Sequence, residues 1–407
     1  MVFETPVTIL LVGIGGYGNT YLDLLFKEGA AHQAILVGVV DIHPERSDYY
    51  SRIVDQGIPI YSTIEDFFEQ AYADLTIIST PIHLHAQHSC FAMRQGSHVL
   101  CEKPMCASLS EAKEMIGARN ETNTFLAIGF NWSFTPAVQR LKADVINGVF
   151  GKPLRLKTIA LWPRTRDYYT RSSWAGKTYS SNGQPIFDSV ANNATAHFLH
   201  HMFYILGKEM HTSIALKTVT AELYRANPIE TFDTCATRII TENDIEILFY
   251  ASHAVETYQG PHFVFEFENA TLTYSMDEEE RQVIAHFNDG SKKYYADPEQ
   301  ERPRKLWTCI EAVRTHSNQV LCGPEAAASH MLAIHAMHQS VPEAIAFPEQ
   351  IKRFDSDTKL TWVTGLSEGL MECYSQGILP SESGLVWSRR GKTIAVDHSW
   401  LPFNQKI

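Results

Sequence analysis

Up to Phe130, hydrophobic residues gather in short runs separated by stretches with helical spacing. The runs are rich in Val, Ile and Leu and are bounded by Gly, Pro, Ser or Asp, as expected of buried strands. We predict strands at Thr8–Val12, Ile35–Val40, Leu75–Ser79, Val99–Lys103 and Thr124–Phe130. We predict helices between them at Tyr21–Phe26, from about Pro44, at His85–Gln95 and at Ser110–Ala118. This alternation predicts an α/β fold with a doubly wound parallel sheet.

Beyond Asn131 the pattern changes, and strand-like runs come to dominate. It predicts a helix at about Pro136–Asn147, strands at Leu154–Leu161, Ile245–Tyr250 and Phe263–Phe267, a helix at about Ala326–Gln339, and a tail with one helix and a strand-like Gly384–Trp387. A chain of 407 residues is too long for one compact core. We therefore expect a first domain at residues 1–131 and a second at residues 132–407.

The composition narrows the class of partner. Hydrophobic residues make up 44% and charged residues 20% of the chain, which is typical of a globular protein in water. The 46 acidic residues outnumber the 34 basic ones and give a formal charge of -12. This balance argues against nucleic acid or an anionic membrane as partner and favours a small-molecule ligand.

The cysteines and the N-terminal region indicate the cellular compartment. The seven cysteines are an odd number and are scattered without a C-x-x-C pair, so they do not resemble a disulfide framework. The apolar run Thr8–Val12 is too short for a signal or membrane segment. These features predict a cytoplasmic protein.

A glycine-rich turn follows the first predicted strand. Its sequence, Gly13-Ile14-Gly15-Gly16-Tyr17-Gly18, leads directly into a predicted helix. Glycines at this spacing permit a tight turn, close approach of a pyrophosphate and close packing of the helix, whose N-terminus favours negative charge. The next predicted strand ends in Asp41, the expected place for an acid that binds the adenosine ribose. The turn therefore predicts a dinucleotide site that prefers NAD to NADP, because Asp41 would repel a 2'-phosphate.

A second motif, Glu102-Lys103-Pro104, ends the predicted strand that begins at Val99. The proline favours an extended conformation for the residue before it, so Lys103 should project from the carboxyl end of the strand. Ligands of open α/β sheets bind at that edge. Thr80-Pro81 closes another strand at the same edge, with His85 close behind it.

Three segments together carry a resemblance to a known family. Gly13-Ile-Gly-Gly-Tyr-Gly18, Ser79-Thr-Pro-Ile-His-Leu-His85 and His98-Val-Leu-Cys-Glu-Lys-Pro104 resemble the glucose-fructose oxidoreductase and inositol dehydrogenase family, Gfo/Idh/MocA. The resemblance implies a Rossmann domain followed by an α+β domain with an open, mostly antiparallel sheet. It also implies action on sugars, inositols or related polyols, and a homo-oligomer, either dimer or tetramer.

The resemblance also implies a set of site residues. The cofactor would contact the turn Gly13–Gly18, Asp41, Thr80, Pro81, His85, Glu102 and Lys103. The catalytic base would be His197, in a predicted helix that ends at Leu206-Gly207. Asn193 lies four positions before His197, so we expect the two side chains to share one face of this helix. The family pattern resembles Asp-x-x-x-His, whereas this chain has Asn193 in place of the aspartate. An amide contributes no charge, so His197 should be a weaker base, although Asp188 in the preceding loop offers a carboxylate.

The segment from Trp162 to Gly176 is rich in arginine and aromatic residues and has no periodicity. Such side chains stack on sugar rings and bind hydroxyl or carboxylate groups, but an ordinary long loop explains the composition equally well. We expect substrate contacts from Arg164, Arg166, Tyr169 and Trp174. His197 and His201 have helical i, i+4 spacing, yet no H-E-x-x-H pattern or third ligand is present, so we predict no metal.

The residues and the resemblance together imply hydride transfer between a secondary alcohol of a sugar-like substrate and nicotinamide, with Lys103, His197 and Asn193 at the reacting hydroxyl. Two alternatives remain. The first keeps NAD bound and uses a transient oxidation to cleave a glycoside or to eliminate a group. The second is a regulator that binds NAD without catalysis, although such a protein would need neither Lys103 nor His197.

Overall fold

The computed structural model describes residues 5–398 and residue 401. The chain forms two compact units. The first unit runs to Phe134 and also includes the later segment Glu301–Pro324, whereas the second comprises Thr135–Gln300 and continues from Glu325. The expectation of one change at residue 131 did not include this return of the chain to the first unit.

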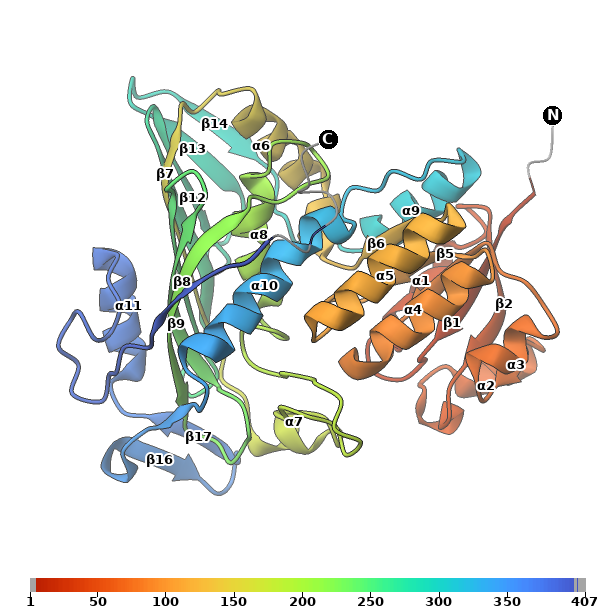
Figure 1. The fold of residues 1–407 in the computed structure, drawn as a ribbon, viewed down its shortest axis with the longest axis horizontal. Coiled ribbons are helices and arrows are strands. Elements are labelled where there is room, and N and C mark those ends of the chain that lie inside the picture. Colours follow the sequence, from red (N-terminus) through yellow and green to blue (C-terminus); the bar gives the residue numbers. More distant parts are fainter. Residues whose placement is uncertain (1–4, 399–400, 402–407) are drawn as a thin grey trace. The chain divides into compact units, whose positions relative to one another are not determined.

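The first unit contains a six-stranded parallel sheet with the order β3-β2-β1-β4-β5-β6 (Figure 1). The strands are β1 Val7–Val12, β2 Ala34–Val40, β3 Ile60–Tyr61, β4 Leu75–Ile78, β5 His98–Cys101 and β6 Leu126–Ile128. The strands read as continuous apolar runs because both faces of such a sheet are covered. The order reverses between β1 and β4, which confirms the predicted doubly wound sheet and makes the carboxyl ends of these strands the expected place for a ligand.

Helices cover both faces of this sheet. They are α1 Gly18–Glu28, α2 Tyr50–Asp55, α3 Ile64–Phe68, α4 His85–Arg94, α5 Leu109–Thr122 and α9 Arg304–Arg314. Helix α4 packs against α5, β4 and β5, whereas α9 packs against β1, β4 and β5. Helix α5 begins where the sequence favours it, because Ser108 and Glu111 form a reciprocal capping box.

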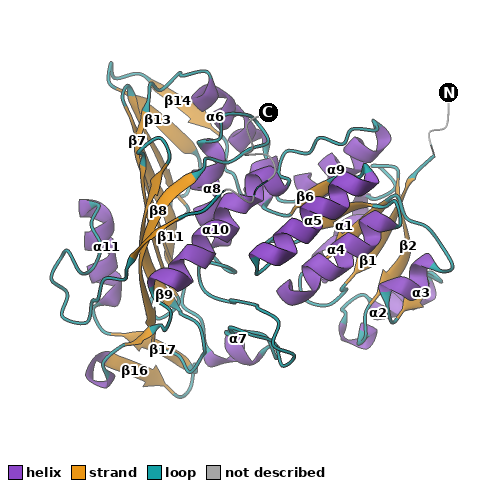
Figure 2. Ribbon diagram, in the orientation of Figure 1, coloured by secondary structure: helices purple, strands orange, loops and turns teal. Residues whose placement is uncertain are grey.

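The second unit contains a ten-stranded, mostly antiparallel sheet, as the resemblance implied (Figure 2). Its path is β14-β13-β12-β11-β7-β10-β9-β8-β15, and β18 also pairs with β8. The strands are β7 Pro153–Leu161, β8 Leu216–Arg225, β9 Thr234–Thr241, β10 Glu246–Ser252, β11 Gln259–Phe267, β12 Ala270–Ser275, β13 Val283–Phe287, β14 Lys292–Tyr295, β15 Ile345–Ala346 and β18 Thr393–Ala395. Among the strands that the structure describes in this sheet, only the β7–β10 and β8–β15 pairs are parallel.

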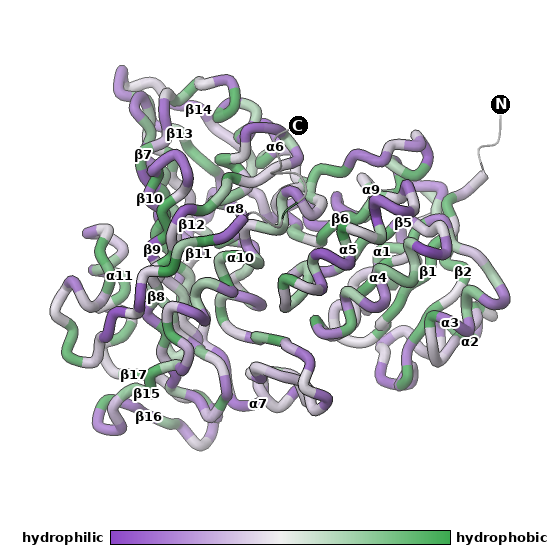
Figure 3. Tube along the Cα trace, in the orientation of Figure 1, coloured by the Kyte–Doolittle hydropathy of each residue, from purple (hydrophilic) through white to green (hydrophobic). Residues whose placement is uncertain are grey.

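The two faces of this sheet carry different helices. Figure 1 shows α8 (Ala196–Ile205) and α10 (Pro324–Ser340) on one side and α11 (Leu366–Gln376) on the other. The helix α6 (Pro136–Ile146) contacts α8 and β14. Along the strands between these layers, hydrophobic positions are interspersed with hydrophilic ones (Figure 3). No helix among the described residues is long and apolar enough to cross a membrane.

The face that packs against α11 is covered by the chain between Ile345 and Trp387. Alternate strand residues such as Ile159, Leu248 and Tyr250 pack there with Leu366 and Leu370. A small two-stranded sheet, β16 (Lys352–Asp355) with β17 (Leu360–Val363), belongs to this covering segment. The expected strand at Gly384–Trp387 is wrong, because these residues form a turn from which Leu385 and Trp387 pack onto the same apolar cluster.

On the same covered face of the sheet, ion pairs lie beside the apolar cluster. Glu246 of β10 pairs with Arg155 of β7 at 2.6 Å and with Arg238 of β9 at 2.7 Å. Arg238 also binds Glu382 of the covering segment through both of its terminal nitrogens, with the Nη2–Oε2 contact at 2.8 Å. The planar guanidinium suits such a bidentate contact, so the pair holds the covering segment in one register on the sheet.

We expect Leu370→Ala to lower the free energy of unfolding by about 2–5 kcal/mol, because it leaves a cavity in this fully buried cluster. The matched control is Glu368→Ala on the exposed side of the same helix, which should change stability by less than about 0.5 kcal/mol. Urea denaturation of both variants measures the difference. Equal stability of the two variants would show that α11 does not contribute to the core.

Candidate functional site

The glycine-rich turn combines close packing with open space. A Cβ at Gly13, whose φ is +85°, would lie 2.7 Å from the carbonyl oxygen of Ser79, and a Cβ at Gly18 would lie 2.2 Å from that of Gly13. Both positions therefore need glycine for packing. A Cβ at Gly15 would meet no atom within 4 Å. Packing does not require glycine there, so close approach of a ligand to the backbone is the better physical reason for it.

The beginning of α1 suits an anionic group. The helix starts at Gly18, and no acidic residue stands in its first turn. The partial positive charge of the helix N-terminus is therefore not opposed locally, and it adds to the open space at Gly15. A pyrophosphate fits these two features.

Asp41 follows β2 and connects that strand to the turn. Its Oδ2 accepts a hydrogen bond from the Ile14 N–H at 2.9 Å, and its Oδ1 accepts one from the His43 N–H at 2.8 Å. An ionised carboxylate has acceptor sites beyond these two, so it can still bind ribose hydroxyls. The structure thus places Asp41 next to the glycine turn, as expected for a dinucleotide site.

His85 joins the two other segments that the sequence singled out. Its imidazole is buried, with Nδ1 2.8 Å from the carbonyl oxygen of Pro104 and Nε2 2.9 Å from that of Thr80. Burial lowers the pKa of His85 against the opposing effect of these carbonyl groups. The ring therefore braces the Thr80-Pro81 turn against the end of the Glu102-Lys103-Pro104 segment. Direct contact of His85 with a cofactor remains a prediction.

Glu102 lies one residue beyond the end of β5, and its carboxylate is buried. Its Oε1 accepts a hydrogen bond from the Tyr21 hydroxyl at 2.5 Å and forms an ion pair with Lys305 of α9. Its Oε2 accepts a bond from the Lys103 backbone N–H at 3.3 Å. The sequence placed Glu102 among the cofactor contacts, whereas these contacts direct its carboxylate into the protein.

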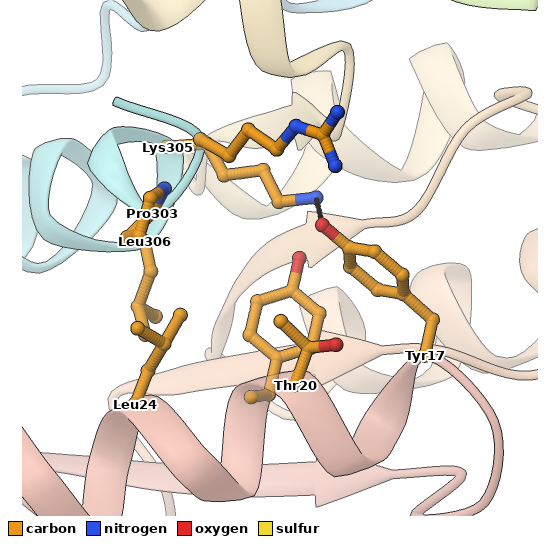
Figure 4. Close-up of a pocket in the computed structure, with 8 residues that line it drawn as sticks. Tyr17, Thr20, Leu24, Pro303, Lys305 and Leu306 are labelled. Carbon is orange, nitrogen blue, oxygen red and sulfur yellow. Dashed lines mark hydrogen bonds between the residues drawn. The ribbon is translucent and has the colours of Figure 1, made fainter. Parts of the chain in front are cut away.

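Lys305 is a residue that the sequence reasoning missed. Its ammonium also lies 3.4 Å from the Tyr17 hydroxyl, which points toward it across a small pocket of about 120 Å³ (Figure 4). Burial by itself would lower the pKa of Lys305, but Glu102 and the Tyr17 hydroxyl raise it above its ordinary value. The sequence offered one sign of this residue. Lys305 is a single lysine on the apolar side of an amphipathic helix, next to Leu306 and Cys309.

In the second unit, Asn193 lies before a helix rather than on it. Helix α8 begins at Ala196, and the Asn193 N–H donates to the Ser189 carbonyl at 3.0 Å in the preceding turn. The expected common helical face of Asn193 and His197 is therefore wrong. His197 lies in the first turn of α8 and is half-buried.

Asp188 contacts Asn193 directly. Its buried carboxylate accepts a hydrogen bond from the Asn193 side-chain amide at 2.7 Å and one from the Gly176 N–H at 2.6 Å. An ionised carboxylate only accepts, so the Asn193 nitrogen must face Asp188 and its oxygen must point elsewhere. Asn193 thus presents an acceptor on the side away from Asp188.

The neighbouring histidines of α8 lie in the core. His200 and His201 are both buried, and burial lowers the pKa of each, that of His201 to about 3. Neutral, buried imidazoles of this kind serve packing. Among the described residues, no group of three or more His, Cys, Asp or Glu side chains could hold a metal ion.

The arginine-rich and aromatic segment contains the short helix α7, Arg166–Thr170. The Arg164 guanidinium lies 5.2 Å from the centre of the Tyr168 ring, and that of Arg166 lies 3.9 Å from the centre of the Phe354 ring. The Tyr169 hydroxyl is buried without a hydrogen-bond partner among the described residues. A ligand could supply that partner. Trp174 is half-buried near Arg171.

Comparison with known proteins agrees with this geometry. Residues 7–130 match the model of the oxidoreductase family with an NAD-binding Rossmann fold, Gfo/Idh/MocA. This region belongs to that family, which confirms the resemblance carried by the glycine turn and the Glu102-Lys103-Pro104 motif.

Two curated relatives match part of the chain. The glucose-6-phosphate 3-dehydrogenase of Bacillus subtilis (strain 168) is 28% identical over 147 residues, which are 36% of this chain and 40% of the relative. The levoglucosan dehydrogenase of Pseudarthrobacter phenanthrenivorans is 28% identical over 142 residues, which are 35% of each chain. The matched region thus spans less than half of these relatives.

A solved structure matches over most of the chain. The WlbA dehydrogenase from Bordetella pertussis, in complex with NADH and UDP-GlcNAcA, has a TM-score of 0.68 at 19% identity, with 83% of this chain and 97% of that chain covered. This likeness shows the fold.

We expect Gly15→Ala to weaken NADH binding at least tenfold while the melting temperature stays close to that of the wild type, because the added methyl group enters open space where a pyrophosphate would lie. Gly18→Ala is the contrasting variant and should destabilise the unit by collision with the Gly13 carbonyl. Fluorescence titration with NADH and thermal unfolding separate the two effects. Unchanged NADH binding in Gly15→Ala would remove the pyrophosphate from this turn.

Proposed function

We propose that the protein is an NAD-dependent oxidoreductase that acts on a secondary alcohol of a sugar, inositol or related polyol. The observation that supports this most directly is the glycine turn with Asp41 bonded to it, within a region of the NAD-binding family. The names of the matched relatives, both sugar dehydrogenases, support the class of substrate.

In this proposal the turn Gly13–Gly18 binds the pyrophosphate and Asp41 binds the adenosine ribose. Asp41 favours NAD over NADP, because its charge would lie against a 2'-phosphate. The bound nicotinamide supplies the hydride acceptor. Thr80, Pro81 and Lys103 lie at the carboxyl edge of the sheet, where that ring would be. Glu102 supports Lys103 rather than the cofactor.

Two side chains act on the reacting hydroxyl. His197 takes its proton as general base, and Lys103 stabilises the negative charge that develops on the oxygen. Asn193, held by Asp188, offers its amide oxygen to a substrate hydroxyl or to the imidazole. Arg164, Arg166, Tyr169 and Trp174 bind the rest of the substrate, and the Tyr169 hydroxyl is the best supported of these because it is buried without a partner among the described residues.

The alternative reaction retains NAD and uses a transient oxidation for glycoside cleavage or elimination. The presence of Asn193 in place of an aspartate favours it, because a weaker base suits a simple dehydrogenase less well. NAD that copurifies and does not turn over would support this reaction. A protein that binds NAD and converts nothing would instead be a regulator.

A screen of polyols, sugars and aryl glycosides with NAD or NADP tests the proposal, read by absorbance of the reduced nicotinamide and by mass spectrometry of products. We expect net reduction of NAD with at least one substrate. Lys103→Ala should abolish turnover while NADH binding remains, because the glycine turn and Asp41 hold the adenosine half. Turnover near the wild-type rate in Lys103→Ala would refute the role of Lys103.

The Asp188–Asn193 contact leads to a prediction for the base. Asn193→Asp alone places two carboxylates where one hydrogen bond of 2.7 Å now lies, so they should share a proton and add little charge. The exchanged variant Asp188→Asn/Asn193→Asp puts the charge at position 193. It should raise the pKa of His197 and move the acidic limb of kcat/KM to higher pH.

Profiles of kcat/KM against pH for the wild type, the single variant and the exchanged variant decide this question. His197→Ala serves as the reference and should lose roughly 10²-fold to 10⁴-fold in rate. Identical acidic limbs in the wild type and the exchanged variant would mean that position 193 does not influence the base. If His197→Ala left the rate nearly unchanged, Asp188 and Tyr169 would be the next candidates for the base.

A further inference from the structure

The buried ion pair between Glu102 and Lys305 joins four segments of the first unit. Glu102 follows β5, Lys305 belongs to α9, Tyr17 and Tyr21 stand at the beginning of α1, and Gly129 follows β6. The Lys305 ammonium lies 4.6 Å from the centre of the Tyr17 ring and 3.5 Å from the Gly129 carbonyl oxygen. Lys305 is 2% exposed and Glu102 is 7% exposed. Both charges are therefore withdrawn from water.

Stability alone is a poor reason for such a pair. Desolvation of two charges offsets much of their attraction, and apolar residues of similar size often serve a core as well. The residues around Lys305 on α9, including Leu306 and Cys309, show that this surface accepts apolar side chains. A function for the charge itself is the better explanation.

The position of Glu102 indicates that function. It directly precedes Lys103, and its carboxylate already accepts the Lys103 backbone N–H. A buried carboxylate is compensated by hydrogen bonds, by a cation or by both. Lys305 supplies the cation at Oε1 of Glu102, whereas the Lys103 N–H bonds Oε2. Without Lys305, the ammonium of Lys103 is the adjacent group that could take its place.

We propose that Lys305 is a positioning residue that neutralises Glu102 and thereby keeps the ammonium of Lys103 directed to the substrate oxygen. This inference rests on the proposed function, in which Lys103 stabilises the charge on that oxygen. Lys305 touches neither substrate nor cofactor in this arrangement and acts through Glu102.

The titratable groups around the pair set the background for a pH experiment. They are Tyr17 and Tyr21 of the α1 region, His85 of α4, Cys101 of β5 and Cys309 of α9. Burial keeps each buried member of this set neutral, since it raises the pKa of Tyr21, Cys101 and Cys309 and lowers that of His85. Within this cluster the charge is therefore carried by Glu102 and Lys305.

Lys305→Met and the double variant Glu102→Gln/Lys305→Met test the inference. Competitive labelling with an amine-specific reagent across pH, read by mass spectrometry of the Lys103 peptide, gives the pKa of Lys103 without any substrate. We expect Lys305→Met to raise this pKa by about one pH unit or more, because the carboxylate is left without Lys305. The double variant should return it toward the wild-type value. With the substrate from the screen, kcat should fall at least tenfold in Lys305→Met and recover at least threefold in the double variant.

A purely structural role predicts no such recovery, so a double variant that is as impaired as Lys305→Met in both readouts would overturn the inference. If Lys305→Met does not fold, Glu102→Gln replaces it, because it leaves the Lys305 charge beside Lys103. The pKa of Lys103 should then be lower in Glu102→Gln than in the double variant, and equal values would overturn the inference. If none of the substrates in the screen lets the wild type reduce NAD, the proposed function is refuted. The labelling result would still decide the role of Lys305.

Discussion

The parallel arrangement of β1 to β6 is the constraint from which the site in the first unit follows. All strands of such a sheet end at the same edge, and side chains that follow different strands must meet there. The glycine turn follows β1, Asp41 follows β2, Thr80 follows β4 and Lys103 follows β5. The bond from the Ile14 N–H to Asp41 and the two contacts of His85 hold these segment ends together. Residues far apart in the chain thus come together at one edge of the sheet.

Next to this edge, the buried carboxylate of Glu102 forms an ion pair with the ammonium of Lys305. The Glu102 carboxylate lies in an apolar layer where an isolated charge would be very unfavourable. Lys305 and the Tyr21 hydroxyl both bond to this carboxylate. Lys305 belongs to the segment Glu301–Pro324, which follows Thr135–Gln300 of the second unit in the chain but belongs to the first unit. The return therefore has a chemical consequence beyond covering the sheet. It supplies the cation that pairs with Glu102.

In the second unit, the buried carboxylate of Asp188 is stabilised by hydrogen bonds. The amide of Asn193 and the backbone N–H of Gly176 both donate to its carboxylate. The exchange of an expected aspartate for Asn193 then becomes understandable, since an aspartate in that place would face a carboxylate at hydrogen-bond distance. On the sheet of the same unit, α11 and the segment around Glu382 cover one face.

The sequence by itself determined the features that depend on near neighbours. Apolar runs between helical stretches predicted the doubly wound sheet, and the spacing of Gly13, Gly15 and Gly18 before a helix predicted the turn, because strand, turn and helix propensities act over a few residues. Lys103 stood out because the proline after it restricts its conformation. Tertiary structure alone decided that Lys305 pairs with Glu102, 203 positions away, and that Asp188 turns the amide of Asn193. It also decided that Gly384–Trp387 packs as a turn instead of pairing as a strand. Partners of buried polar groups are chosen by packing between distant segments, and local patterns carry no information on that choice.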